Sequence, residues 1–197
     1  MSRTDFKPGN MLYPLPVVMV SVQRPGEKAN IITLAWAGTV CSSPAMVSIS
    51  VRPERYSYNI IKETGEFVVN LTTKELTFAT DICGVLSGKD VDKFEKAGLT
   101  KSESKCVGAP GIAESPVNIE CKVVEERPLG SHTMFIAEVV NVSVDEKYMD
   151  ESGRFHLNDA ELITYSHGEY YSLGEKLGSF GYSVRKKSKK QEKIKEQ

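Results

Sequence analysis

Side chains able to bind a charged ligand are concentrated between Ala29 and Tyr58. This stretch holds the chain's single tryptophan, Trp36, together with Arg52, Arg55 and seven serines and threonines. Guanidinium and hydroxyl groups donate hydrogen bonds to anions, and an indole ring offers a broad flat surface. The stretch therefore predicts a site for a ligand that has an anionic end and a planar end.

Short apolar runs rich in β-branched residues predict the strands that position these groups. The expected strands are 17–22, 30–36, 46–51, 67–71, 118–126 and 133–144. A Pro-Gly turn at 24–27 is expected to join the first two strands as a hairpin, and residues 40–45 are expected to form a loop before the third. In that third strand Ser48 and Ser50 should face away from Ile49, because side chains alternate along a strand.

Helical periodicity appears in two places. One helix is expected to begin near Tyr56 and end at Gly65, and residues 74–99 form a helical section in which Gly84 caps the first helix. Several strands in hairpin order, interrupted by short helices, predict a mainly β fold: an antiparallel barrel, closed or nearly closed, with the helices packed across it. The expected organisation is a single domain over 1–184 followed by a basic, solvated tail over 185–197.

Charge and missing motifs exclude several classes of function. The tail carries seven lysines and arginines against two glutamates, on a chain whose formal charge is -1, and a basic end on an acidic body is not a nucleic-acid-binding face. No G-x-G-x-x-G follows a strand, and residues 84–89 are one residue too short for a phosphate-binding loop. The three histidines are too far apart to predict a metal site.

The chain also lacks the signals of a membrane or secreted protein. No apolar run approaches the ~20 residues of a membrane span, and the first ten residues contain no apolar signal core, so a cytoplasmic location is expected. In a reducing compartment the four irregularly spaced cysteines should be free thiols. Each is expected to be a small buried or half-buried residue, and they are Cys41, Cys83, Cys106 and Cys121.

Longer stretches of the sequence resemble the flavin reductase-like family, whose members have an FMN-binding split β-barrel, and within it the flavoredoxin group. The similar stretches cover most of residues 12–182 in the family's order; they are 13–17, 29–36, 43–44, 47–52, 65–70, 87–94 and 130–133. The resemblance implies FMN bound non-covalently near a homodimer interface. It also implies that electrons come from NAD(P)H or pass to a redox partner protein.

The resemblance further implies which residues bind the cofactor. Those for the ribityl chain and phosphate are Asn30, Thr33, Leu34, Ala35, Ser50, Val51, Arg52, Arg55 and Ser57. Arg52 is our first choice for the phosphate and Arg55 the second, because a guanidinium matches phosphate geometry. The alternative is that Arg52 is a surface arginine paired with Glu54. If Arg52 pairs directly with the FMN phosphate, Arg52→Ala should weaken FMN binding by about 1.5 to 3 kcal/mol.

Other residues are implied for the isoalloxazine ring. Trp36 would form a wall of the ring site, although a lone strand tryptophan can equally be a core residue. His132 and Lys93 would serve the N1 and C2 carbonyl end, where reduction places negative charge. The alternatives are a structural histidine and a solvated helix lysine. Tyr165 and Phe180 would cover the outer face of the ring.

Mechanism and function follow from the same resemblance. Hydride passes directly between nicotinamide and flavin N5 in such enzymes, so no catalytic side chain is assigned, and no metal. The first hypothesis is an NAD(P)H-dependent flavin or acceptor reductase. The alternative is a flavoredoxin-like electron carrier that retains its FMN, and a third is a split-barrel relative that has lost flavin and binds some other ligand.

Overall fold

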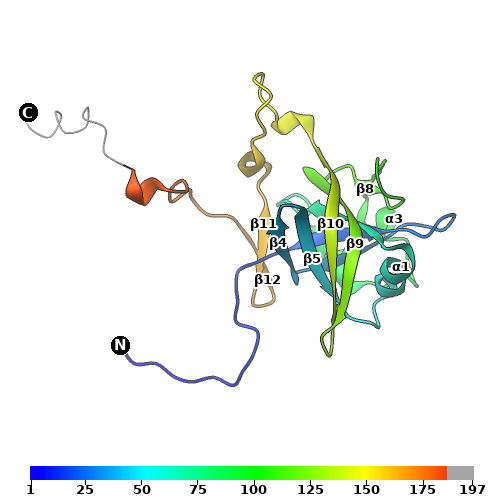
Figure 1. The fold of residues 1–197 in the computed structure, drawn as a ribbon, viewed down its shortest axis with the longest axis horizontal. Helices are drawn as coiled ribbons and strands as arrows, with labels where there is room; N and C mark the ends of the chain where they lie inside the picture. Colours follow the sequence, from blue (N-terminus) through cyan, green and yellow to red (C-terminus); the bar gives the residue numbers. More distant parts are fainter. Residues whose placement is uncertain (186–197) are drawn as a thin grey trace, which may run out of the picture.

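The computed structural model describes residues 1–185 and is built on one curled antiparallel sheet (Figure 1). Its seven strands lie in the order β3-β2-β6-β9-β10-β5-β4. The strands are β2 (Val18–Val22), β3 (Asn30–Leu34), β4 (Ala37–Ser42), β5 (Ala45–Val51), β6 (Glu66–Leu71), β9 (Val117–Pro128) and β10 (Thr133–Val144). The expected mainly β, antiparallel split-barrel fold is confirmed.

The concave side of the sheet encloses the main core. Val20, Ile49, Phe67 and Phe135 come from four different strands and are each at most 1% exposed. Their alternation with residues on the other face is what curls a sheet around an apolar interior. The Ser50 N–H donates a hydrogen bond to Trp36 O over 2.8 Å, which continues the β4–β5 pairing by one residue. As the sheet curls, the end of β3 comes against β5. This seam is where the barrel is split.

Three short helices complete the packing. The helix α1 (Tyr56–Thr64) ends at Gly65, whose φ of 66° is the left-handed cap that the sequence predicted. The helices α2 (Thr77–Val85) and α3 (Lys93–Ala97) cover the other face of β2 and β3. A second apolar cluster fills that layer; it includes Met19, Ile31, Cys83, Phe94 and Ile112. Strand β2 is therefore buried on both faces, as its continuous apolar sequence predicted.

A separate three-stranded sheet lies beside the seam. It is formed by β1 (Leu15–Pro16), β11 (Ile163–Ser166) and β12 (Glu169–Ser172), with β11 in the middle. The sequence predicted this region to be irregular, and its only regular part is this hairpin with a tight turn at His167 and Gly168, which have φ of 49° and 88°. The remaining elements are the small strands β7 (Lys101–Ser102) and β8 (Gly111–Ile112) and three 3-10 turns, η1 (Glu146–Tyr148), η2 (Leu157–Ala160) and η3 (Tyr182–Val184).

Three sequence predictions were wrong. Residues 40–45 are not a loop, because β4 runs to Ser42 and pairs with β5 at the sheet edge, where exposed side chains hide the usual apolar pattern. Gly84 does not cap α2, which continues to Val85 with its cap at Leu86. Cys106 was expected to be buried or half-buried, but it is exposed. Its loop is held by the Cys106 backbone N–H, which donates to Glu120 Oε2 over 2.6 Å, and not by packing of the thiol.

The first residues of the chain and the segment that leads to Arg185 extend away from this body (Figure 1). The expected boundary between a domain over 1–184 and a basic tail stays a prediction, because residues beyond Arg185 lie outside the described part of the chain. Within residues 1–185, no helix has the length and apolarity needed to cross a membrane.

Candidate flavin site at the seam of the barrel

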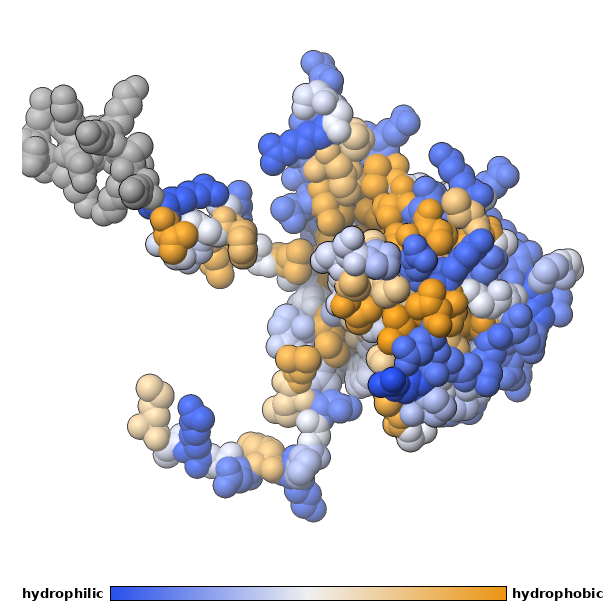
Figure 2. Space-filling view, in the orientation of Figure 1, coloured by the Kyte–Doolittle hydropathy of each residue, from blue (hydrophilic) through white to orange (hydrophobic). Residues whose placement is uncertain are grey.

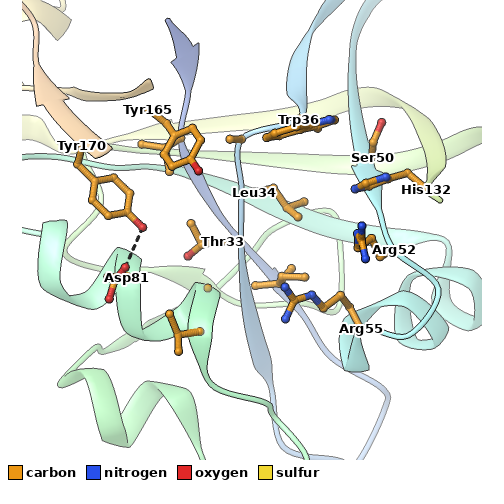
Figure 3. Close-up of a pocket in the computed structure, with 15 residues that line it drawn as sticks. Thr33, Leu34, Trp36, Ser50, Arg52, Arg55, Asp81, His132, Tyr165 and Tyr170 are labelled. Carbon is orange, nitrogen blue, oxygen red and sulfur yellow. Dashed lines mark hydrogen bonds between the residues drawn. The ribbon is translucent and has the colours of Figure 1, made fainter. Parts of the chain in front are cut away.

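The seam opens into a cleft with an outer and an inner cavity. The outer cavity has a volume of about 300 Å³ and lies where the end of β3, the end of β5 and the β11–β12 hairpin meet (Figure 3). Fifteen residues line it: Val17, Ile32, Thr33, Leu34, Ala35, Trp36, Ser50, Arg52, Arg55, Asp81, Gly84, Val85, His132, Tyr165 and Tyr170. The structure thus brings together nine of the residues predicted for cofactor binding.

The inner cavity adjoins the outer one, because Ile32, Arg55 and Gly84 line both. It has a volume of about 200 Å³. The rest of its lining comes from the start of β3, the turn before α1, α1 itself, the loop after α2, and α3; these residues are Asn30, Glu54, Tyr56, Ser57, Leu86, Ser87, Gly88 and Lys93. Three further predicted residues therefore lie here, and Arg55 stands between the two cavities.

Lys93 is a buried cation on the inner cavity. Its side chain belongs to a residue only 4% exposed, and Nζ donates to Ile31 O over 2.7 Å and to Cys83 O over 2.8 Å. Among the described residues no carboxylate lies within 4.0 Å of it. Burial, and to a smaller extent the nearby Arg55 charge, lower its pKa from the ordinary 10.5 to about 8. An anion in the inner cavity would supply the missing counter-charge.

The inner cavity also presents neutral donors in a fixed arrangement. Asn30 Nδ2 donates to Ser57 Oγ over 2.8 Å, in the first turn of α1, where unpaired backbone N–H groups favour anions. Gly88 brings the backbone of its loop directly against Asn30, so a Cβ atom there would overlap the Asn30 amide and lie 2.7 Å from the Tyr56 ring. This close approach is one that only glycine allows. The donor set and its shape fit a phosphate group.

Arg52 and Arg55 have different surroundings. Arg52 Nη1 pairs with Glu54 Oε1 over 2.9 Å, and half of its side chain is exposed, as the surface-pair alternative anticipated. Arg55 has no such ion pair among the described residues and lines both cavities. The geometry therefore favours Arg55 over Arg52 as the phosphate partner.

From this difference we expect Arg52→Ala to weaken FMN binding by at most about 1 kcal/mol, because an exposed pair with Glu54 already occupies the guanidinium. The measurement is a fluorescence titration of apoprotein with FMN. A loss of about 1.5 to 3 kcal/mol, the range for a direct charge-assisted hydrogen bond, would mean that Arg52 contacts the phosphate directly.

Trp36 and His132 form the aromatic side of the outer cavity. Trp36 is 38% exposed, so the core alternative for this tryptophan is wrong. Its ring lies parallel to the His132 ring, with 6.3 Å between centroids and 3° between planes. Ser131 Oγ hydrogen bonds to His132 Nδ1 over 2.9 Å. Burial, and then the Arg52 charge, lower the pKa of His132, which favours a neutral imidazole able to donate one hydrogen bond.

Four of the predicted site residues lie elsewhere than the sequence predicted. Lys93 and His132 were expected at one end of the flavin, but they line different cavities, and the solvated-lysine alternative is wrong because Lys93 is buried. Val51 was expected at the cofactor site, but it is fully buried in the main core and lines neither cavity, because its side chain alternates with those of Ser50 and Arg52. Phe180 is fully exposed on the extended C-terminal segment, away from both cavities, because nothing in residues 1–185 packs on it.

The sequence reasoning missed the residues that α2 and the hairpin contribute. Asp81, Gly84 and Val85 line the outer cavity, and Tyr170 joins them through a hydrogen bond to Asp81. Asp81 and Val85 are four residues apart on one helix face, but that face could be assigned to the cleft only once α2 was known to lie against β3.

The curled sheet and its seam define an antiparallel split-barrel protein whose cleft has a cationic inner end and an aromatic outer end. The family described as "Flavin reductase like domain" matches residues 10–174. The chain therefore belongs to the flavin reductase-like family, a family of flavin-binding oxidoreductases.

Relatives in sequence and structure agree with this membership. The flavoredoxin of Desulfovibrio vulgaris (Miyazaki F) superposes with a TM-score of 0.85 at 30% identity, over 93% of this chain and 100% of that one. An uncharacterized protein of Archaeoglobus fulgidus is 35% identical over 82% of this chain and 89% of its own length. A ferric-chelate reductase (NAD(P)H) of the same organism is 29% identical over 64% of this chain and 66% of its own.

Proposed function

We propose that this protein is an FMN-dependent NAD(P)H oxidoreductase that reduces a flavin or another small acceptor. The observation that carries the proposal is the buried Lys93 ammonium, which has no carboxylate partner among the described residues and borders the inner cavity of about 200 Å³. Lys93, Arg55, Asn30 and Ser57 would hold the phosphate. The planar ring would occupy the outer cavity beside Trp36.

The roles of the remaining residues follow from their positions. Thr33, Leu34 and Ala35 line the outer cavity directly after Ile32, which lines both cavities, and a ribityl chain would lie along them; Ser50 lines the same cavity. Neutral His132 offers a hydrogen-bond donor on the ring side, and Tyr165 closes the outer face. The bound flavin would accept hydride at N5, so these residues position the ring and exclude water, and none needs to transfer a proton.

A second function is favoured by the similarity to flavoredoxin over the full length of that chain. In this alternative the protein retains FMN and passes its electrons to a partner protein. Trp36, which is partly exposed at the edge of the ring cavity, would then lie at the contact.

The two functions are separated by a visible absorption spectrum of the purified protein, recorded before and after adding NADH or NADPH without oxygen. For the oxidoreductase we expect a flavin absorption band at about 450 nm, as for free FMN, and we expect NADH or NADPH to bleach it. We also expect the protein to reduce added free flavin in repeated turnovers. Tightly held FMN that neither nicotinamide bleaches would instead support the carrier. A colourless protein that fails to bind added FMN would contradict both.

We also propose that the protein acts as a homodimer in the cytoplasm. Apolar side chains are displayed over β9 and β10 and along the segment that leaves the body (Figure 2). The exposed apolar residues include Val124, Val142, Leu173, Leu177 and Phe180. A second copy would cover such surfaces. Light scattering of the purified protein tests this, and a monomer at micromolar concentration would contradict it.

A further inference from the structure

One wall of the outer cavity belongs to the β11–β12 hairpin and not to the barrel. Tyr165 and Tyr170 face each other across the two strands of this hairpin, and both line the cavity. Their rings meet edge to face, with 5.9 Å between centroids and 61° between planes. The position of the Tyr165 ring in the cavity therefore depends on where Tyr170 is held.

The hairpin is attached to the rest of the molecule along β11, which pairs with β1 at Leu15 and Pro16, and at two further points. At its base, Ile163 N donates to Thr72 O over 3.2 Å and Thr164 Oγ1 donates to Leu15 O over 2.5 Å. Further along, the Tyr170 hydroxyl donates to Asp81 Oδ1 over 3.1 Å, which joins the hairpin to α2 (Figure 3). The hairpin would stay folded without this second attachment, because its base bonds are independent of it.

The Tyr170–Asp81 bond joins two walls of the cavity, one from the hairpin and one from α2. Asp81 lies one helical turn before Val85 on α2, and both residues line the cavity next to the hairpin. The bond therefore spans the two walls. Burial, and then the hydrogen bond to Asp81, raise the pKa of Tyr170 to about 12, so the hydroxyl remains a donor over the physiological pH range.

We propose that Tyr170 and Asp81 are a positioning pair that holds the Tyr165 wall against the planar ring of the bound flavin and so sets how long the ring stays bound. The inference rests on the proposed flavin site but concerns only its ring half. It distinguishes this pair from Arg55 and Lys93, which would act on the phosphate. Loss of the pair should affect flavins with and without phosphate equally.

The test compares dissociation rates of FMN and riboflavin by stopped-flow fluorescence. We expect Tyr170→Phe to speed up dissociation of both flavins about three- to tenfold, the effect of losing one hydrogen bond. Asp81→Ala should match it and Asp81→Asn, which keeps an acceptor, should give less. The matched control is Tyr171→Phe, because the Tyr171 hydroxyl bonds Glu169 within the same strand and does not reach α2.

The outcomes separate this inference from the proposed function. Unchanged rates in Tyr170→Phe, or a change for FMN alone, would overturn the positioning pair while leaving the flavin site in place. An equal change in Tyr171→Phe would also overturn it, because the effect would then be a general loosening of the hairpin. A wild-type protein that binds neither flavin would overturn the proposed function and the pair with it.

Discussion

Arg55→Ala is expected to weaken FMN binding by about 1.5 to 3 kcal/mol, the range for hydrogen bonds to charged groups. Arg55 borders both cavities and has no ion pair among the described residues, so its guanidinium is free to face the phosphate. Its charge also lies close enough to affect Lys93. Two cations that repel each other in the empty site gain most when a dianion enters. The measurement is a titration of apoprotein with FMN.

Two controls make this result specific. Riboflavin lacks the phosphate, so its affinity should be the same for Arg55→Ala and the wild type. Arg52→Ala lies three residues away on the same turn and removes the same charge, and we expect at most about 1 kcal/mol from it. Equal losses from the two variants would mean that the inner cavity responds only to net positive charge and that Arg55 makes no direct contact.

The sequence predicted most of the fold because the fold is encoded in local patterns. Residues that are neighbours in the sequence determine three of its features: the β-branched run of β2, the Pro-Gly turn before β3 and the Gly65 cap of α1. The strand β4 escaped prediction because an edge strand with both faces exposed has no apolar alternation. The turn between β11 and β12 likewise depends on positive φ at His167, a backbone conformation that is uncommon for residues other than glycine.

The site was only partly predictable, for a different reason. Residues 30–36 and 50–57 were identified because donors cluster along the chain. The sequence did not show which of Arg52 and Arg55 is available for the phosphate, because that depends on which of them pairs with Glu54. Lys93 and His132 could not be separated, because the cleft between them exists only after α3 packs under β3. Asp81 and Tyr170 are 89 residues apart and meet only in the folded structure.

Lys93 should make FMN binding depend on pH, and this is the second large effect that we expect. Its pKa is lowered to about 8 in the protein without ligand, and a bound phosphate, which is a dianion above about pH 6, would raise it again. Binding then takes up a proton above pH 8. We expect the dissociation constant for FMN to rise by up to about tenfold per pH unit from pH 8 upward, and to be flat between about pH 6 and pH 8, where neither the phosphate nor Lys93 changes charge.

The Lys93 contribution to the free energy of unfolding changes with pH in the opposite direction to the FMN affinity, so the two measurements test the same group independently. Between pH 8 and the ordinary pKa of 10.5 the unfolded chain binds more protons at this position than the folded protein, so the Lys93 contribution stabilises the unliganded protein as pH rises. Affinity for FMN should fall over the range in which that contribution to unfolding free energy grows. Both trends would come from one buried ammonium that lacks a counter-charge until the phosphate arrives.

Lys93→Met supplies the decisive comparison. We expect it to lower FMN affinity at pH 7 by about 1.5 to 3 kcal/mol and to abolish the rise in the dissociation constant above pH 8, while riboflavin binding changes little. Lys89→Met is the matched control, because Lys89 lies on the same loop as Gly88 but is exposed and outside the inner cavity. If Lys93→Met retained the pH dependence of the wild type, another group would be responsible and the phosphate would not lie against Lys93.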